Sequence, residues 1–146
     1  MKQKNKSRED VLALLVWFRL SRTYHHSLKQ SNTFLKEWGL TVAQFDVLVH
    51  IGANKRLSQL DLAHSLLVTK GNITKLLAKM EEHGWIKREK EKRSKYLSLT
   101  EKGKQLYDDI LPQQEQQQAA YFNHLTSDEL KQLHELLKKV QEPHAT

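Results

Sequence analysis

Apolar side chains recur at intervals of three and four residues over most of the chain, a pattern that predicts helices. The first such segment spans residues 9–30. Its principal apolar face consists of Val11, Leu14, Leu15 and Phe18. Further apolar residues flank this face, so the stripe is wide enough to be buried either in a core or against a second subunit. A separate short helix is expected from Thr33 to Trp38, ending at Gly39.

Capping motifs indicate where the next two helices begin. Thr41 is followed three residues later by Gln44, and Ser58 is followed by Asp61. In such pairs the first side chain accepts a hydrogen bond from a free backbone N–H group, and the second can return one. The sequence therefore predicts one helix from Thr41 to about Gly52 and another that begins at Ser58.

A fifth helix is expected over residues 69–83, followed by a β-hairpin. Thr69 can cap this helix, and Gly84 can end it in the left-handed conformation that glycine favours. Its apolar positions repeat at helical spacing and are Ile73, Leu76, Leu77 and Met80. Two short strands, residues 85–87 and 96–99, then flank a charged tip over residues 89–95.

The last third of the chain predicts two more helices. One runs from Thr100 to about Tyr121, with Pro112 as a kink or local break and the glutamine run 113–118 on a solvated face. The other begins at the capping pair Thr126 and Glu129. It carries an apolar seam suited to packing against another helix: Leu130, Leu133, Leu137 and Val140. The fold class predicted is mainly α, with a single β-hairpin.

Composition narrows the class of protein. A chain of 146 residues fits one compact domain or two small, intimately packed pieces. It has no cysteine, which excludes disulfides, thiolate metal sites and thiol-based redox switches. No apolar run reaches the roughly 18–20 residues that a membrane span needs. The first residues are basic and polar rather than a signal-peptide core, so we expect a cytoplasmic protein with no membrane partner.

The positive charge is concentrated on one part of the chain. The net charge is +7, and residues 68–104 hold eleven Lys or Arg against five Asp or Glu, an excess of six. Residues 105–146, by contrast, carry more acidic than basic side chains. A local cationic surface on a helix followed by a hairpin is typical of a protein that binds double-stranded DNA.

The outward face of the helix over residues 69–83 has the chemistry that a major groove requires. It is small, polar and cationic, with donors for base edges and cations for phosphates. The residues expected to bind DNA here are Thr69, Lys70, Gly71, Asn72, Thr74 and Lys75. Among them, Thr69 and Gly71 are expected to shape the entry of the helix into the groove.

The hairpin is the second expected DNA contact. An arginine at its tip, Arg93, can enter the narrow minor groove, where the potential is most negative. Glu91 is expected to orient Arg93 or a nearby lysine. The other residues assigned to DNA are Arg88, Lys90, Ser94 and Lys95.

Several motifs along the chain resemble those of the MarR family, and they occur in the family's order from about residue 10 to residue 142. They are Leu40-Thr41-x-x-Gln44-Phe45-Asp46-Val47-Leu48, Leu57-Ser58-Gln59-x-Asp61-Leu62-Ala63, Leu66-Leu67-Val68-Thr69-Lys70-Gly71-Asn72-Ile73-Thr74, Met80-Glu81-x-x-Gly84-Trp85-Ile86-x-Arg88, Lys92-Arg93-Ser94 and Leu99-Thr100-Glu101-Lys102-Gly103. Two features depart from the family pattern. The wing is slightly shorter, and Glu91 stands where the family usually has aspartate.

The resemblance implies a winged helix-turn-helix transcription factor, usually a repressor, that binds a pseudo-palindromic operator as a homodimer. Residues 1–146 would form one MarR-type domain, with the helix-turn-helix over about 57–83 and the wing over about 85–100 of a DNA-binding part spanning 40–100. The first and last helices, within residues 9–30 and 104–142, would form the dimer through the apolar positions given above. The resemblance also implies a small aromatic or anionic effector that releases the DNA.

Other candidate chemistry is weaker. None of the eight histidines is paired at i and i+4, so no metal site is predicted. Asp108 and Asp109 point apart on a helix, and with no nucleophile or phosphate loop nearby we expect no catalysis and no cofactor. The residues of an effector pocket are not identified. Four side chains fit either such a pocket or, more simply, core and interface packing: Trp17, Tyr24, Trp38 and His50.

Three alternatives to a DNA-binding regulator remain at this level. A winged-helix protein-interaction module would bind DNA only weakly and without regard to sequence. An RNA-binding protein would need exposed aromatics on a broader sheet than two short strands provide. An enzyme would need a catalytic constellation, which the sequence lacks.

Overall fold

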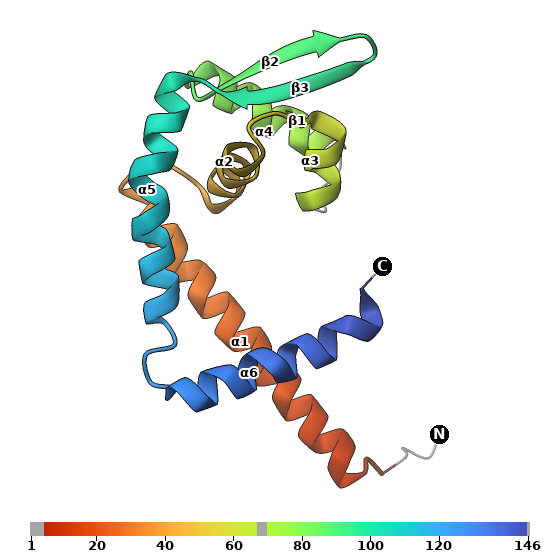
Figure 1. Cartoon of the computed structure of the whole chain (residues 1–146). Helices are drawn as coiled ribbons and strands as arrows, with labels where there is room; N and C mark the ends of the chain where they lie inside the picture. The colour runs from red at the N-terminus through yellow and green to blue at the C-terminus, as the bar shows by residue number, and fades with distance from the viewer. Residues whose placement is uncertain (1–4, 67–69, 146) are drawn as a thin grey trace.

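The computed structural model describes residues 5–66 and 70–145. Their elements follow in the order α1 (Arg8–Lys36), α2 (Val42–Asn54), β1 (Leu57–Ser58), α3 (Gln59–Leu66), α4 (Lys70–Glu82), β2 (Ile86–Glu91), β3 (Ser94–Leu99), α5 (Glu101–Ala120), α6 (Ser127–Gln141) and the 3-10 turn η1 (Glu142–His144). The predicted mainly α class with a β-hairpin is confirmed. Figure 1 shows α2, α3, α4 and the strands gathered at one end, while α5 runs from the sheet towards α1 and α6.

The capping pairs begin the helices where the sequence predicts. The Gln44 backbone N–H donates to Thr41 Oγ1 at 3.1 Å, and Thr41 N–H donates to Gln44 Oε1 at 3.0 Å. The same reciprocal pair joins Thr126 and Glu129 at the start of α6. These bonds satisfy backbone groups that an uncapped helix start leaves free. The end predicted for α2 is two residues short, because the helix continues past Gly52 to Asn54.

The first helix is longer than the sequence predicts. The expected break at Ser31 and Asn32 is wrong, since α1 continues without interruption to Lys36. Thr33 Oγ1 donates to the Lys29 carbonyl oxygen at 3.0 Å, within the helix, and Ser31 Oγ accepts from Gln114 Nε2 of α5 at 2.9 Å. Hydroxyl side chains satisfied in this way do not compete with the helix backbone. Of the separate short helix expected at 33–38, residues 33–36 are therefore the last part of α1, and residues 37 and 38 lie in the turn that follows it.

The sheet has one strand more than the predicted hairpin. Its strand order is β1-β3-β2, with both pairs antiparallel and Leu57 opposite Leu97. The hairpin strands are also longer than expected, because the polar residues predicted as its tip continue the ladder up to the pair Glu91–Ser94. Buried apolar residues anchor only the base of the hairpin: Ile86 and Leu97 are buried, whereas residues 89–95 are exposed and mostly charged and Tyr96 is partly buried.

The hydrophobic core lies beneath this sheet and joins α2, α3, α4, β2 and β3 to the C-terminal end of α1 and to α5. Its fully buried members include Leu35, Val47, Leu48, Ile51, Leu62, Leu77, Met80, Leu97 and Ile110. Helix α5 is continuous through Pro112, so of the kink or local break expected there the break is absent. The glutamine run within it is only partly solvated, because Gln114 is 1 % exposed and bonds across to α1.

Two helical segments extend beyond this core. No residue of α6 is buried, and its apolar side chains Leu130, Leu137 and Val140 are 43, 41 and 63 % exposed. The N-terminal half of α1 is likewise exposed, with Phe18 at 51 %. Over the part of the chain described, no helix combines the length and the apolar character required to cross a bilayer.

Candidate nucleic-acid interface

Helix α4 separates an apolar face from a polar one, as the sequence predicts. Ile73, Leu77 and Met80 are at most 1 % exposed and pack into the core. The opposite face is exposed and contains Gly71, Asn72, Thr74, Lys75, Ala78 and Lys79. Thr69 and the side chain of Lys70 lie outside the described residues. The described part of this face is small, polar and cationic, as close approach to a major groove requires.

The C-terminal end of α4 is closed by Gly84, which the sequence identifies as the stop. Gly84 has φ +77°, its N–H donates to the Glu81 carbonyl, and Trp85 N–H donates to the Met80 carbonyl. These two bonds define the glycine-terminated cap that satisfies the last carbonyls of a helix. Thr100 Oγ1 also donates to the Gly84 carbonyl, so the start of α5 is fixed to the same corner. These bonds therefore fix the direction of the hairpin relative to α4.

A side-chain ion pair joins the hairpin to α4. Arg88 Nε on β2 donates to Glu81 Oε2 on α4 at 2.8 Å. The Arg88 side chain is only 23 % exposed, so this guanidinium is less open to a phosphate than the sequence suggests. The pair keeps the base of the wing against the last turns of α4, and a DNA contact by Arg88 remains a prediction.

The tip of the hairpin is cationic and exposed. Only Lys92 and Arg93 form the loop, and Lys92 has φ +55°, an unusual value for a residue other than glycine. Lys90 and Lys95 stand directly opposite each other on the two strands. Like charges placed opposite each other destabilise a strand pair, and an anionic partner would offset that repulsion. Ser94 is exposed beside them, so the predicted wing residues other than Arg88 share one cationic end.

Glu91 does not orient Arg93 or a lysine, as the sequence suggested, because its partner is Arg56. The Arg56 guanidinium donates to Glu91 Oε2, and it lies 3.8 Å from the centre of the Tyr96 ring. The hydrogen bond to this carboxylate raises the pKa of Arg56 above its usual value. Sequence reasoning missed Arg56, since 35 residues separate it from Glu91.

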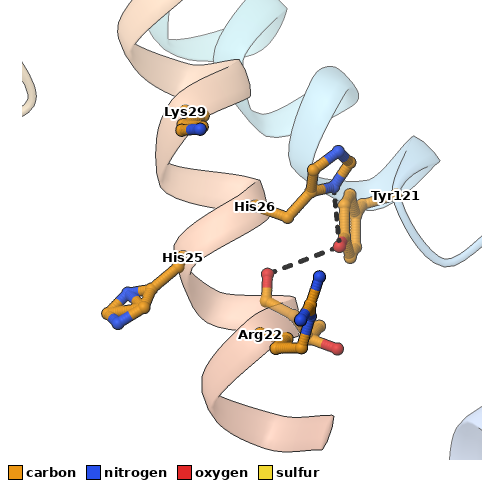
Figure 2. A pocket seen from close by; sticks show the side chains of 6 residues that line it. Arg22, His25, His26, Lys29 and Tyr121 are labelled. Atoms are coloured by element: carbon orange, nitrogen blue, oxygen red, sulfur yellow. Dashed lines mark hydrogen bonds between the residues drawn. The ribbon is translucent and has the colours of Figure 1, made fainter.

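A second candidate site lies between α1 and the end of α5. Arg22, Thr23, His25, His26, Lys29 and Tyr121 line an open groove of about 460 Å³. Figure 2 shows His26 and Tyr121 turned towards each other and His25 pointing away from them. His26 Nδ1 and Tyr121 Oη are 3.2 Å apart, and the tyrosine hydroxyl donates to the Thr23 carbonyl at 3.4 Å. The basic side chains Arg22 and Lys29 beside an aromatic ring give this groove the chemistry to hold a small aromatic anion.

The aromatic residues considered for an effector pocket are not gathered in one place. Trp17 and Tyr24 are 68 and 60 % exposed on α1. Trp38 is partly buried against the core, and His50 Nδ1 is hydrogen-bonded to the Asp46 carbonyl at 2.8 Å within α2. The groove between α1 and α5 is lined by other residues. Packing is therefore the better interpretation for Trp38, and the exposed aromatics of α1 belong with its apolar face.

Histidine and carboxylate side chains are the metal ligands that this cysteine-free chain could offer. Within residues 5–66 and 70–145, no three such side chains lie close enough together to hold a metal ion. Asp108 and Asp109 are both exposed on α5.

The chain is similar to helix-turn-helix transcriptional regulators in sequence and in structure. Residues 38–95 match the family model described as the MarR family. A protein of Bacillus cereus, described as an uncharacterized HTH-type transcriptional regulator, is 40 % identical over 134 residues, which cover 91 % of each chain. The crystal structure of AbsC, a MarR family transcriptional regulator from Streptomyces coelicolor, superposes with a TM-score of 0.82 at 21 % identity, covering 96 % of this chain and 97 % of AbsC. A mutant MarR from E. coli, complexed with operator DNA, superposes with a TM-score of 0.76 at 25 % identity, covering 92 % of this chain and 99 % of that one.

Proposed function

The chain belongs to the MarR family of winged helix-turn-helix transcriptional regulators, and we propose that it is a homodimeric repressor that binds a pseudo-palindromic operator until a small effector releases it. Its function is regulation of transcription rather than catalysis. The observation that carries the DNA-binding proposal is the exposed polar and cationic face of α4, held beside a cationic wing by the Arg88–Glu81 pair. The E. coli MarR mutant to which the chain is similar was solved with operator DNA, which supports DNA as the partner.

In the proposed complex the N-terminal part of α4 lies in the major groove. Asn72 and Thr74 would face base edges, and Lys70 and Lys75 would meet phosphates or base acceptors, while Thr69 and Gly71 shape the entry of the helix. At the wing, Arg93 would enter the minor groove. The remaining wing residues would approach phosphates: Arg88, Lys90, Ser94 and Lys95.

The proposed dimer uses the apolar surfaces that a single chain leaves in solvent. These surfaces are the exposed Val11, Leu14, Leu15 and Phe18 on α1 and, on α6, the exposed Leu130, Leu137 and Val140 with the partly buried Leu133. Monomeric proteins rarely expose contiguous apolar patches of this kind. A symmetric pair of chains would place two copies of α4 at half-sites about one helical turn apart. We accordingly divide the single MarR-type domain, 1–146, into a DNA-binding part at 40–100 and dimerisation segments at 9–30 and 104–142.

The proposed effector is a small aromatic anion bound between α1 and α5. The groove that contains Arg22, Lys29 and Tyr121 supplies cations and a ring for such a molecule. Because α5 continues from the wing to this groove, a molecule wedged there would change how the DNA-binding parts are spaced. The operator would be released if the effector binds more tightly to the conformation in which the spacing of the DNA-binding parts does not fit the operator than to the conformation in which it does.

The experiment that tests the proposed function is selection of DNA from a random library, followed by binding titrations. A specific regulator is expected to enrich a palindromic sequence and to prefer it over unrelated DNA by at least about a thousandfold. The effector proposal is tested by titrating small aromatic acids into the protein–operator complex. Binding that is weak and independent of sequence would instead indicate a winged-helix protein-interaction module.

Lys75→Ala is expected to lower operator affinity and to reduce the salt dependence of binding. Lys75 is exposed on the outward face of α4, where its ammonium group can neutralise a phosphate. Loss of one phosphate contact lowers the slope of log affinity against log salt concentration by about 0.9. Titrations at four salt concentrations would measure the slope. Lys139→Ala, which removes the same charge from α6, should leave the slope unchanged, and an unchanged slope for Lys75→Ala would show that this residue contacts no phosphate.

Arg93→Ala is expected to weaken operator binding and to relax the preference for A·T pairs at the operator flanks. A·T-rich segments have a narrow minor groove whose negative potential attracts arginine. The comparison is between the operator and a version with G·C flanks, for wild type, Arg93→Ala and the charge-matched Arg93→Lys. In Arg93→Ala we expect the preference for A·T flanks to fall about threefold to tenfold. Equal affinity and equal flank preference in all three proteins would show that Arg93 does not enter the minor groove.

A further inference from the structure

Arg56 connects the body of the DNA-binding part to the tip of the wing. It lies between α2 and β1, at the opposite edge of the sheet from β2, because β3 separates the two strands. Its side chain crosses this sheet, stacks 3.8 Å from the centre of the Tyr96 ring on β3 and donates to the Glu91 carboxylate at the end of β2. A single side chain therefore joins all three strands next to the two-residue loop that carries Arg93.

The backbone before Arg56 is held in a strained turn. Lys55 has φ 58° and ψ −49°, and Arg56 N–H donates to the Asn54 carbonyl across it. This is the geometry of the three-residue γ-turn that proteins use rarely, because it is strained for residues other than glycine. Such strain persists only where surrounding contacts maintain it, and it often accompanies function. Here the strained turn directs Arg56 onto the sheet instead of letting α2 continue.

The free wing would lack other supports at its tip. The apolar contacts of the hairpin end with Ile86 and Leu97 at its base, and the Arg88–Glu81 pair also lies near the base. Beyond them, Lys90 faces Lys95 across the strands, a repulsive pair. The contact of Arg56 with Glu91 and Tyr96 is the described side-chain contact that lies nearest the tip. A two-stranded ribbon without such a contact is marginally stable and bends readily.

We propose that Arg56 is the positioning residue of the wing. By binding Glu91 and Tyr96 it holds the hairpin tip in the orientation from which Arg93 enters the minor groove. It thereby determines the preference for operator flanks without itself contacting a base. Glu91 serves as the anchor for Arg56, which explains why a carboxylate stands in an otherwise cationic tip. This inference rests on the proposed DNA-binding function.

The main competing role for Arg56 is a direct contact with a phosphate, and the two roles differ in their consequences. A phosphate-binding arginine would be released by Glu91→Gln, so that affinity would rise at unchanged flank preference. A positioning arginine needs its anchor, so Glu91→Gln should lower flank preference as Arg56→Ala does. Glu89→Gln is the matched control, because Glu89 lies two residues earlier on the same strand and face. It removes the same charge and leaves the Arg56–Glu91 bond in place.

The first measurement compares binding of the selected operator and its G·C-flanked version. Arg56→Ala and Glu91→Gln are each expected to lose about threefold to tenfold of the flank preference, the range expected for an exposed ion pair combined with a cation–π contact. Glu89→Gln should keep the preference. The charge-reversed pair Arg56→Glu with Glu91→Arg should recover most of the preference that Arg56→Glu alone loses. Failure of this reversal, together with a reduced salt slope for Arg56→Ala, would identify a phosphate contact and overturn the proposal.

The second measurement needs no DNA. Hydrogen–deuterium exchange of the wing peptides, residues 86–99, should be about threefold to tenfold faster at the tip in Arg56→Ala, with the rest of the protein unchanged. Both side chains of the pair are about half exposed, so circular dichroism should show the same fold and melting close to wild type. Unchanged exchange at the tip would overturn the positioning role. A wild-type protein without operator preference would overturn the proposed function and this role in DNA binding, while the exchange rates would still decide whether Arg56 holds the tip.

Discussion

Gly103→Ala is expected to destabilise the protein by about 4 kcal/mol or more, a loss that single substitutions reach only exceptionally. Gly103 is the third residue of α5, where the helix touches the chain leaving α4. A Cβ atom at this position would lie 1.9 Å from the Trp85 carbonyl oxygen and 2.8 Å from the carbonyl carbon. Because these are backbone atoms, no change of rotamer relieves the overlap, and α5 must move away from Trp85.

The same substitution is expected to abolish operator binding. Thr100 N–H donates to the Trp85 carbonyl at 3.1 Å, and Gly103 N–H donates to Thr100 Oγ1 at 3.0 Å. Movement of α5 would therefore break the corner from which α4 and the wing depart, and their relative placement would be lost. Urea unfolding measures the stability, and titration with the operator measures the binding.

Gly71→Ala is the control for this prediction. Gly71 is exposed on α4 and has no atom within 4 Å of an added Cβ. Alanine favours a helix over glycine by roughly 0.5–1 kcal/mol, so the protein should be equally stable or slightly more stable. A Gly103→Ala protein that unfolds within about 1 kcal/mol of wild type would show that α5 does not approach Trp85 closely.

Phe18→Glu and Leu137→Glu are each expected to convert the protein to monomers and to lower operator affinity at least about a hundredfold. Phe18 on α1 and Leu137 on α6 are 51 and 41 % exposed in the single chain. In the proposed dimer they would be covered by the second chain, where a buried and unpaired carboxylate is strongly unfavourable. The affinity falls because a dimer engages its second half-site as an intramolecular event, whereas two monomers must bind separately.

Sedimentation velocity gives the oligomeric state, and operator titration gives the affinity. Gln132→Glu is the matched control, since it adds a carboxylate to the same helix at an exposed position roughly a third of a turn from the apolar seam. This control should remain dimeric. If both apolar variants sediment as the wild type does and bind the operator equally well, the two exposed faces serve another partner and the dimer assignment is wrong.

Much of the fold follows from short-range patterns in the sequence. The pairs Thr41 with Gln44 and Thr126 with Glu129 begin helices where predicted, and Gly84 ends α4 in a left-handed conformation. The helical spacing of apolar residues correctly separates the buried from the exposed face of α4. These signals are reliable because each depends on residues within about one helical turn, where backbone hydrogen bonds fix the geometry.

The tertiary structure alone decided which distant groups meet. Ser31 and Asn32 look like a break, yet α1 continues through them, and Gln114 on α5, 83 residues from Ser31, supplies a hydrogen bond. The partner of Glu91 is Arg56 rather than an adjacent cation. The number of residues between two side chains does not give their distance in space, which depends on strand register and helix packing.

Most of the helices, the hairpin, the cationic face and the family could thus be predicted from the order of the residues. Local propensity, capping and charge are properties of neighbouring residues, and they are present before the chain folds. Only the folded chain decided that Arg88 is held by Glu81, that Arg56 holds the wing tip, and that Gly103 lies against the Trp85 carbonyl. The physical reason is that ion pairs and close contacts act over a few ångströms, and packing of the whole core decides which residues come within that range.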